Sequence, residues 1–179
     1  VMVQGISVFV LGRIVQVNLF QPILGEKGFP VTSYGVVMGG MAIFEALGSG
    51  YPHTVRRYLS DLNAVFVFTL IMAGTLSAIA LSGMAGTAVA LAVFALVGGL
   101  SFPIQRQLLN DTIPDARYRA TLMSMESIVD RAVNAWVASL LAAYVSTGRT
   151  GAFLQLSAAV TVGLLFVLFI AMRVRRARA

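Results

Sequence analysis

The sequence predicts an all-α membrane protein with six transmembrane helices. Of its 179 residues, 58% are hydrophobic and only 11% are charged, whereas soluble domains carry about 25% charged residues. Residues 62–105 contain no charge, and neither do residues 150–172. A helix needs about 20 apolar residues to cross a bilayer. We therefore expect the chain to cross a membrane several times, with the lipid bilayer as one of its partners.

Breaks in the apolar pattern divide the chain into six segments. Pro22 and the polar stretch 25–30 close the first segment, and the second contains Glu45 near its middle. The charge-free run is too long for one helix, and residues 82–86 supply turn residues, so two helices are expected there. Asp115 is a suitable N-cap for the fifth segment. The predicted helices are residues 2–24, 33–51, 62–81, 87–109, 116–146 and 151–172, followed by a basic tail, residues 173–179.

Basic residues are divided unequally between the two sets of connections. One set holds only Lys27 and Arg149. The other set holds nine: Arg56, Arg57, Arg106, Arg117, Arg119, Arg173, Arg175, Arg176 and Arg178. Connections rich in Lys and Arg stay in the cytoplasm. This asymmetry predicts a multi-pass protein of the inner cell membrane with both ends of the chain in the cytoplasm.

The distribution of charged residues also divides the six segments into two groups of three. The third and sixth segments carry no charge, while the first, second and fifth carry charges within their spans and the fourth ends in residues 105–107, Gln-Arg-Gln. Two three-helix repeats, each with its third helix facing lipid, would give this pattern.

The fifth segment holds the most costly charges. A charged residue at the centre of a membrane helix costs about 2.5–3.5 kcal/mol, which calls for a polar partner or a water-filled cavity. At 100° per residue, Glu126, Asp130 and Asn134 share one helix face, with Arg131 at its flank. This face either lines a transport pathway or forms an ion-pair lock that fixes helix packing. Glu126 lies nearer the cytoplasmic end, where it could meet water.

Three polar residues in the first two segments are further candidates for a cavity or for proton coupling. Glu45 is expected about 18 Å from the outer surface, close to the middle of the bilayer. There it could exchange a proton as a cavity opens to alternate sides, or serve as a packing residue. Arg13, with Gln16 one turn later, is the cation that could face it. Gly35, Gly39 and Ala46 have the spacing of a close helix contact, and Gly98, Gly99 and Pro103 indicate a hinge or a static bend.

Several classes of function have no support in the sequence. The chain has no Cys, a single His (His53), no phosphate-binding loop and no Gly-x-Ser-x-Gly or His-Glu-x-x-His motif. We therefore expect no enzyme activity, no metal and no cofactor. The net charge of +6 is spread over the connections rather than gathered with aromatic residues, so no nucleic acid partner is expected.

Residues 106–127 resemble the loop between the tenth and eleventh helices of major facilitator superfamily transporters. The resemblance is to the drug-efflux-like branches, and the matching residues are Asn110, Pro114, Arg119, Ala120, Thr121 and Ser124. The six segments would then be the C-terminal six-helix half of a twelve-helix transporter. The family's Gly-x-x-x-Asp-Arg/Lys-x-Gly-Arg-Arg loop motif is only partly present: Gly48, Arg56 and Arg57 match, but Pro52, His53 and Val55 do not.

The resemblance implies secondary active transport of a small organic solute by alternating access, with protons as the coupling ion. The missing N-terminal half of the same protein would be the partner that completes the substrate cavity. Gly48, Arg56, Arg57, Asp115 and Arg119 would belong to the gating loops on the cytoplasmic side. Two alternatives are a six-helix protein that dimerises to build the cavity, and a channel or membrane scaffold that does not transport.

Overall fold

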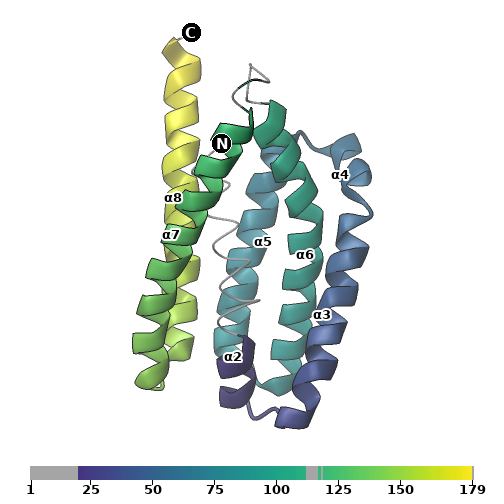
Figure 1. Ribbon diagram of the computed structural model, residues 1–179, viewed down its shortest axis with the longest axis vertical. Coiled ribbons are helices and arrows are strands. Elements are labelled where there is room, and N and C mark those ends of the chain that lie inside the picture. Colours follow the sequence, from purple (N-terminus) through teal and green to yellow (C-terminus); the bar gives the residue numbers. More distant parts are fainter. Residues whose placement is uncertain (1–19, 112–116, 118, 179) are drawn as a thin grey trace.

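The computed structural model describes residues 20–111, 117 and 119–178, and every regular element in these residues is a helix (Figure 1). Five of the helices are long and apolar enough to cross a membrane: residues 31–49, 61–81, 84–108, 120–146 and 150–170. The prediction of an all-α membrane protein is confirmed at this level. The elements are α2 (Phe20–Glu26), η2 (Val31–Ser33), α3 (Tyr34–Ser49), α4 (Pro52–Tyr58), α5 (Asp61–Leu81), α6 (Met84–Asp111), α7 (Arg119–Ser146) and α8 (Thr150–Arg178).

The observed helices differ from the predicted ones most clearly in three respects. The short helix α4 was not predicted; it begins with Pro52, whose ring suits the first turn of a helix. Only Ser82 and Gly83 separate α5 from α6, so the turn is shorter than expected. Helix α8 continues to Arg178 instead of ending at Met172, because residues 173–178 contain no Gly or Pro to stop it. The first predicted helix lies mostly outside the described residues, which include only its last part, α2.

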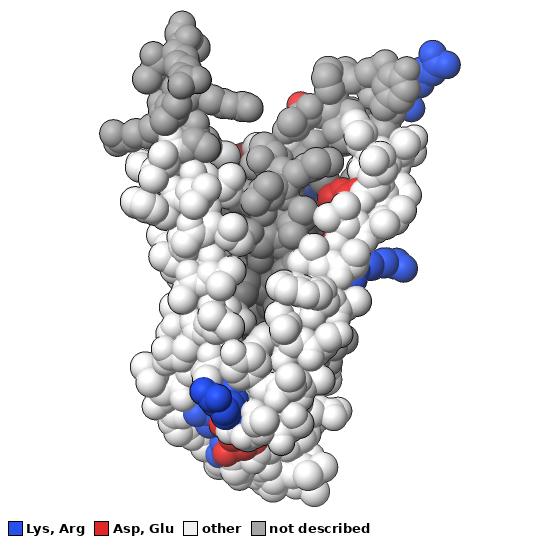
Figure 2. Space-filling model, turned by 90° about the vertical axis from the view of Figure 1, so that its left-hand side faces the viewer, with Lys and Arg blue, Asp and Glu red and all other residues white. Residues whose placement is uncertain are grey.

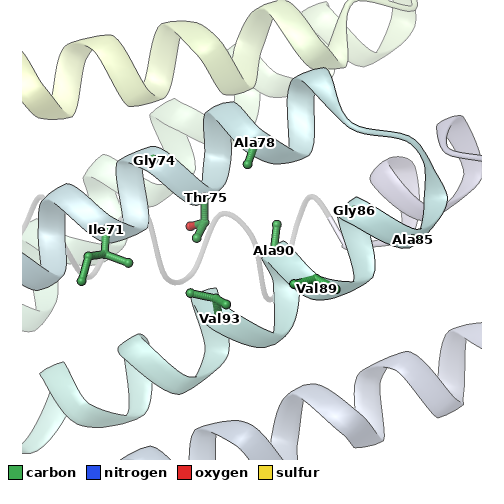
Figure 3. Close-up of a pocket in the computed structure, with 9 residues that line it drawn as sticks. All are labelled: Ile71, Gly74, Thr75, Ala78, Ala85, Gly86, Val89, Ala90 and Val93. Carbon is green, nitrogen blue, oxygen red and sulfur yellow. The ribbon is translucent and has the colours of Figure 1, made fainter.

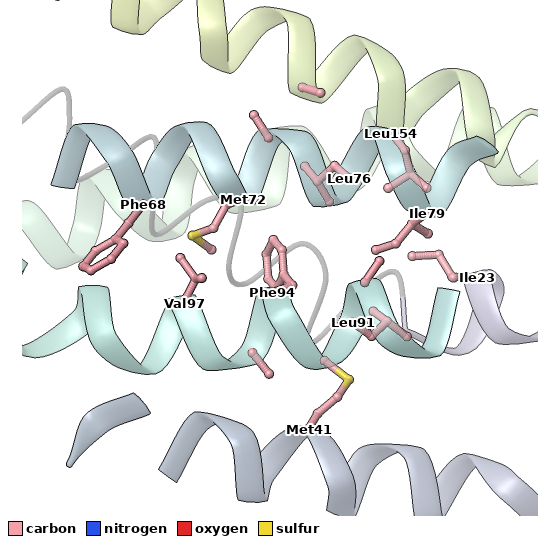
Figure 4. Close-up of a cluster of buried hydrophobic side chains, with 14 of the residues drawn as sticks. Ile23, Met41, Phe68, Met72, Leu76, Ile79, Leu91, Phe94, Val97 and Leu154 are labelled. Atoms are coloured by element: carbon pink, nitrogen blue, oxygen red, sulfur yellow. The ribbon is translucent and has the colours of Figure 1, made fainter. Parts of the chain in front are cut away.

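The core lies between α5 and α6. Phe68, Met72, Leu76 and Ile79 of α5 meet Leu91, Phe94 and Val97 of α6, all of them buried (Figure 4). Other elements also contribute to this core, among them α2 with Ile23, α3 with Met41 and α8 with Leu154 (Figure 4).

Helix α5 is more central than a helix expected to face lipid. It packs against both α6 and α8, and half of its most apolar stretch is buried. Only one stripe points outward, formed by Val67, Leu70, Ile71, Gly74, Ala78 and Leu81. Helix α8 has a broader outward face that includes Val160, Phe166, Val167 and Ile170. Thus α8 fits the expectation better than α5.

Helices α3 and α6 touch backbone to backbone at two glycines. A methyl group added to Gly48 would overlap the main-chain oxygen of Leu96, and one added to Gly99 would overlap that of Glu45. Gly35 and Gly39, predicted to make such a contact, have nothing within 4 Å, and Ala46 is exposed. The close contact therefore lies in the last turn of α3, at Glu45 and Gly48. Gly99 is held by this contact, while Pro103 sits inside an unbroken helix and removes the helical hydrogen bond to the carbonyl of Gly99.

Lys27 joins the connection after α2 to the end of α5. Its Nζ donates to the carbonyl oxygens of Ala80 at 3.1 Å and Ser82 at 2.8 Å. The last carbonyls of a helix have no partner within the helix and carry partial negative charge. The ammonium group therefore caps α5 from another part of the chain.

The two sets of connections lie at opposite ends of the bundle. Helix α4, the end of α6, the start of α7 and the C-terminus lie at one end (Figure 1). The turns after α5 and α7, together with η2, lie at the other end (Figure 1). We call the first end, which carries Arg56, Arg57, Arg106 and Arg117, the basic end. Charged side chains are few on the face shown in Figure 2, and large areas of that face have none, as a lipid-exposed surface requires.

Candidate functional site at the basic end

The polar face of α7 points into the bundle. Glu126 and Asp130 are 8% and 5% exposed, and Asn134 on the next turn is half-buried. Arg131 is exposed, so it does not share the environment of the adjacent Asp130. Most other residues of α7 are exposed, among them Met125, Ile128 and Trp136. Two carboxylates are thus among the few buried side chains of this candidate membrane span.

Glu126 pairs with Arg106 of α6. Nη1 of Arg106 donates to Oε2 of Glu126 over 3.1 Å, and the arginine side chain is 32% exposed against 8% for the glutamate. The guanidinium also lies over the ring of Phe102, 5.7 Å from its centroid. The expectation that Glu126 could simply meet water is therefore wrong. The ion pair supplies the partner that a buried carboxylate requires.

A second polar contact links three helices at the same end. Nε and Nη2 of Arg56 in α4 donate to the two carboxylate oxygens of Asp61 at the start of α5, at 2.9 and 3.3 Å. Nη1 of Arg56 also donates to the side-chain oxygen of Gln107 near the end of α6. Such a two-pronged pairing fixes orientation as well as distance. We call Arg56, Asp61, Gln107, Arg106 and Glu126 the basic-end network.

The basic-end network ties together four elements that are distant in sequence. Gln107 and Arg106 are neighbours on α6, and through them α6 is linked to α4 and α5 on one side and to α7 on the other. Gln105, the residue before them, is buried and donates to Ser101 over 2.6 Å. The end of α6 is therefore the hub of this network.

Glu45 lies about one turn from the end of α3. Because α3 ends at Ser49, Glu45 is about 6 Å from that end of the helix and about 18 Å along it from Ser33. Its position near the middle of the bilayer stays a prediction. Its side chain is half-buried, and its main-chain carbonyl faces Gly99 at the crossing of α3 with α6.

Other predicted site residues are only partly covered. Arg13, Gln16 and Asp115 lie outside the described residues. Arg119 begins α7. Gly48 belongs to the last turn of α3, where it makes the close contact with α6.

No protein-family model, curated protein or solved structure matches this chain. The likeness of residues 106–127 to major facilitator superfamily transporters therefore stays an expectation. The function has to be argued from the geometry of the basic end and of α7.

The structure adds Arg106, Asp61 and Gln107 to the residues of interest. From the sequence, Arg106 was assigned only to the basic residues of the connections, and neither Asp61 nor Gln107 was a candidate site residue. The signal that could have found Arg106 and Gln107 is the polar run 105–107 at the end of an otherwise apolar helix. Among the described residues, no group of three His, Asp or Glu side chains is placed to hold a metal ion. The chemistry available here is that of carboxylates and guanidinium groups.

Proposed function

We propose that this chain forms one half of a secondary active transporter, which moves a small organic solute by alternating access and couples it to protons. The observation that carries the proposal is the burial of Glu126 and Asp130 on one face of α7, a helix long and apolar enough to span the membrane. Acidic residues inside membrane spans are costly and are characteristic of ion and substrate pathways.

The two carboxylates have different roles in this proposal. Glu126 lies about 10 Å from the start of α7 and is paired with Arg106. Asp130 lies about 16 Å from the start of α7, which is roughly half the thickness of the hydrocarbon core. Through its ion pair with Arg106, Glu126 positions α7 against α6. Asp130, which is deeper, is the residue we assign to proton exchange.

The other half of the cavity would come from a second six-helix unit. In α3 and α7, only 11% of the most apolar stretch is buried, and both present large apolar side chains outward, such as Phe44 and Trp136. Helices so poorly covered fit an arrangement in which another bundle packs on them. An N-terminal half of the same protein is the proposed partner.

The same two uncovered helices also favour a second candidate, a homodimer in which two copies of the chain build the cavity. The two arrangements differ in stoichiometry. Single-molecule photobleaching of the fluorescently labelled chain in liposomes gives two bleaching steps for a homodimer. One step per particle is expected if the partner is a different six-helix unit.

Transport itself is tested in proteoliposomes that contain the complete reading frame to which these residues belong. A pH gradient is imposed, the uptake of ethidium is followed by fluorescence, and Asp130→Asn is compared with the unchanged protein. Loss of proton-driven uptake, with retained exchange of ethidium in the absence of a gradient, is the expected result. Asp111→Asn is the matched control, because Asp111 is exposed at the end of α6. Full proton-driven uptake by the Asp130→Asn protein contradicts the proposed coupling role.

A further inference from the structure

Two apolar grooves run along α5, one on each side of its outward stripe. The first lies between α5 and α6, has a volume of about 700 Å³, and includes Ile71, Gly74 and Ala78 opposite Gly86, Val89 and Val93 (Figure 3). The second lies between α5 and α8 and has a similar volume of about 700 Å³. Gly74 lines both grooves. The grooves are therefore neighbours that meet at one residue.

Small residues create both grooves. A Cβ added at Gly74 or at Gly163, which lines the second groove, would meet nothing within 4 Å. The space beside these residues is open in the structure rather than filled by neighbouring helices. A larger side chain could therefore occupy either groove without moving the backbone.

On α5, both grooves lie in the half of the helix that ends at Leu81. Their α5 residues extend from Leu70 to Ala78, which are about 17 and 5 Å from the end of α5 at Leu81. The hydrocarbon core is about 30 Å thick. The grooves thus reach from one surface of the core to about its middle, which is the depth of one lipid leaflet.

Lys27 is linked to the rim of the first groove through Ser82. Lys27 bonds to the carbonyl of Ser82, and the side chain of Ser82 lies against Gly86 of the groove. An ammonium group has three N–H donors, and the carbonyls of Ala80 and Ser82 accept two of them. The third can donate to an anionic oxygen at the membrane surface.

We propose that the two grooves bind one anionic diacyl phospholipid, with one acyl chain on each side of Gly74 and the phosphate near Lys27. The shape selects this occupant over a helix. A helix with its side chains is about 10 Å across. It would pack over the outward stripe of α5 as one body and would not enter two separate grooves. Two open grooves on either side of one helix match two flexible chains joined at a headgroup. Basic groups between helices recognise lipid phosphates.

Native mass spectrometry of the purified chain with added dioleoylphosphatidylglycerol tests the proposal. Gly74→Leu fills both grooves at their meeting point, and we expect about tenfold weaker lipid binding. Gly35→Leu is the matched control, because Gly35 is also an exposed helical glycine with nothing within 4 Å but lies on α3. Equal binding by Gly74→Leu and the unchanged chain overturns the proposal, as does an equal loss in both variants.

Two further measurements separate the parts of the site. Gly163→Leu fills only the second groove, so it should weaken binding of the two-chain lipid while leaving binding of the one-chain lysophosphatidylglycerol unchanged. Lys27→Gln should weaken phosphatidylglycerol binding but not the binding of uncharged dioleoylglycerol. If Gly74→Leu instead converts a dimer of the chain to a monomer, the grooves hold a second copy and the lipid proposal is wrong.

Discussion

Arg106 and Glu126 form an ion pair between the end of α6 and the first turns of α7, with 3.1 Å between Nη1 and Oε2. The glutamate side chain is buried, while the arginine side chain is partly exposed. The pair holds together two helices whose connection is residues 112–118 of the sequence. Its removal therefore tests how α7 is held.

Arg106→Met should destabilise the protein more than Glu126→Gln. The first change leaves a buried carboxylate without its charged partner, which costs about 2–4 kcal/mol after allowance for the partly exposed arginine. The second removes the charge that needs the partner. The free energy of unfolding, measured by SDS titration in mixed micelles, checks the order. Equal losses would mean that the arginine contributes through packing on Phe102 instead.

Gly99→Ala should be far more harmful than Gly98→Ala, although the two residues are adjacent. The methyl group at position 99 would overlap the main-chain oxygen of Glu45, whereas position 98 has nothing within 4 Å. Overpacking costs about 1–3 kcal/mol, while alanine in a helix interior is favoured over glycine by up to about 1 kcal/mol. Thermal unfolding in detergent should show a lowered midpoint for Gly99→Ala alone. A similar loss in both variants would contradict the crossing of α3 and α6.

Asp61→Asn should weaken the attachment of α4. It removes an ion pair of partly exposed groups, worth about 0.2–1 kcal/mol, and an acidic residue in the first turn of α5, worth about 0.3–1 kcal/mol. Proteolysis in the segment 50–60 should become faster, and high salt should reduce the difference from the unchanged protein. Asp111→Asn serves as the control, since this residue is exposed at the end of α6. A difference that does not respond to salt would argue against an electrostatic role.

Lys27→Met should loosen the end of α5. The variant loses two charge-assisted hydrogen bonds to the carbonyls of Ala80 and Ser82, and bonds to charged groups contribute about 1.5–3 kcal/mol. Hydrogen exchange of the amides in residues 78–82 should become faster. Arg149→Met, a change of an exposed basic residue near the start of α8, should leave that exchange unchanged.

The sequence predicted the long helices because their signal is local. Uninterrupted apolar runs of bilayer length identify a membrane helix without knowledge of its neighbours, and helices were expected at all five of the candidate spans. Helix α4 was missed because its seven residues, Pro52–Tyr58, have neither that length nor an apolar periodicity. The end of α3 was predicted two residues beyond Ser49, because the apolar pattern alone does not locate the turn that follows.

Of the candidate site, only the polar face of α7 could be predicted from the sequence. The spacing of Glu126, Asp130 and Asn134 identifies a polar face of one helix, and the burial of the two acids agrees with it. Their surroundings depend on which helices pack together. Arg106 is 20 residues away from Glu126, and Arg56 is 51 residues away from Gln107. Pairings over such separations arise from tertiary packing and leave no periodic pattern in the sequence.

The two-residue turn between α5 and α6 has a consequence for how the protein is made. Residues 62–105 are uncharged, and their two helices pack along one another around Phe68, Met72 and Phe94. The charges of the two helices, Asp61, Arg106 and Asp111, all lie at the basic end, so inserting the pair carries no charged side chain through the hydrocarbon. We expect this pair to leave the translocon as one preassembled hairpin during synthesis, so that the centre of the bundle exists before the charged helix α7 emerges from the ribosome.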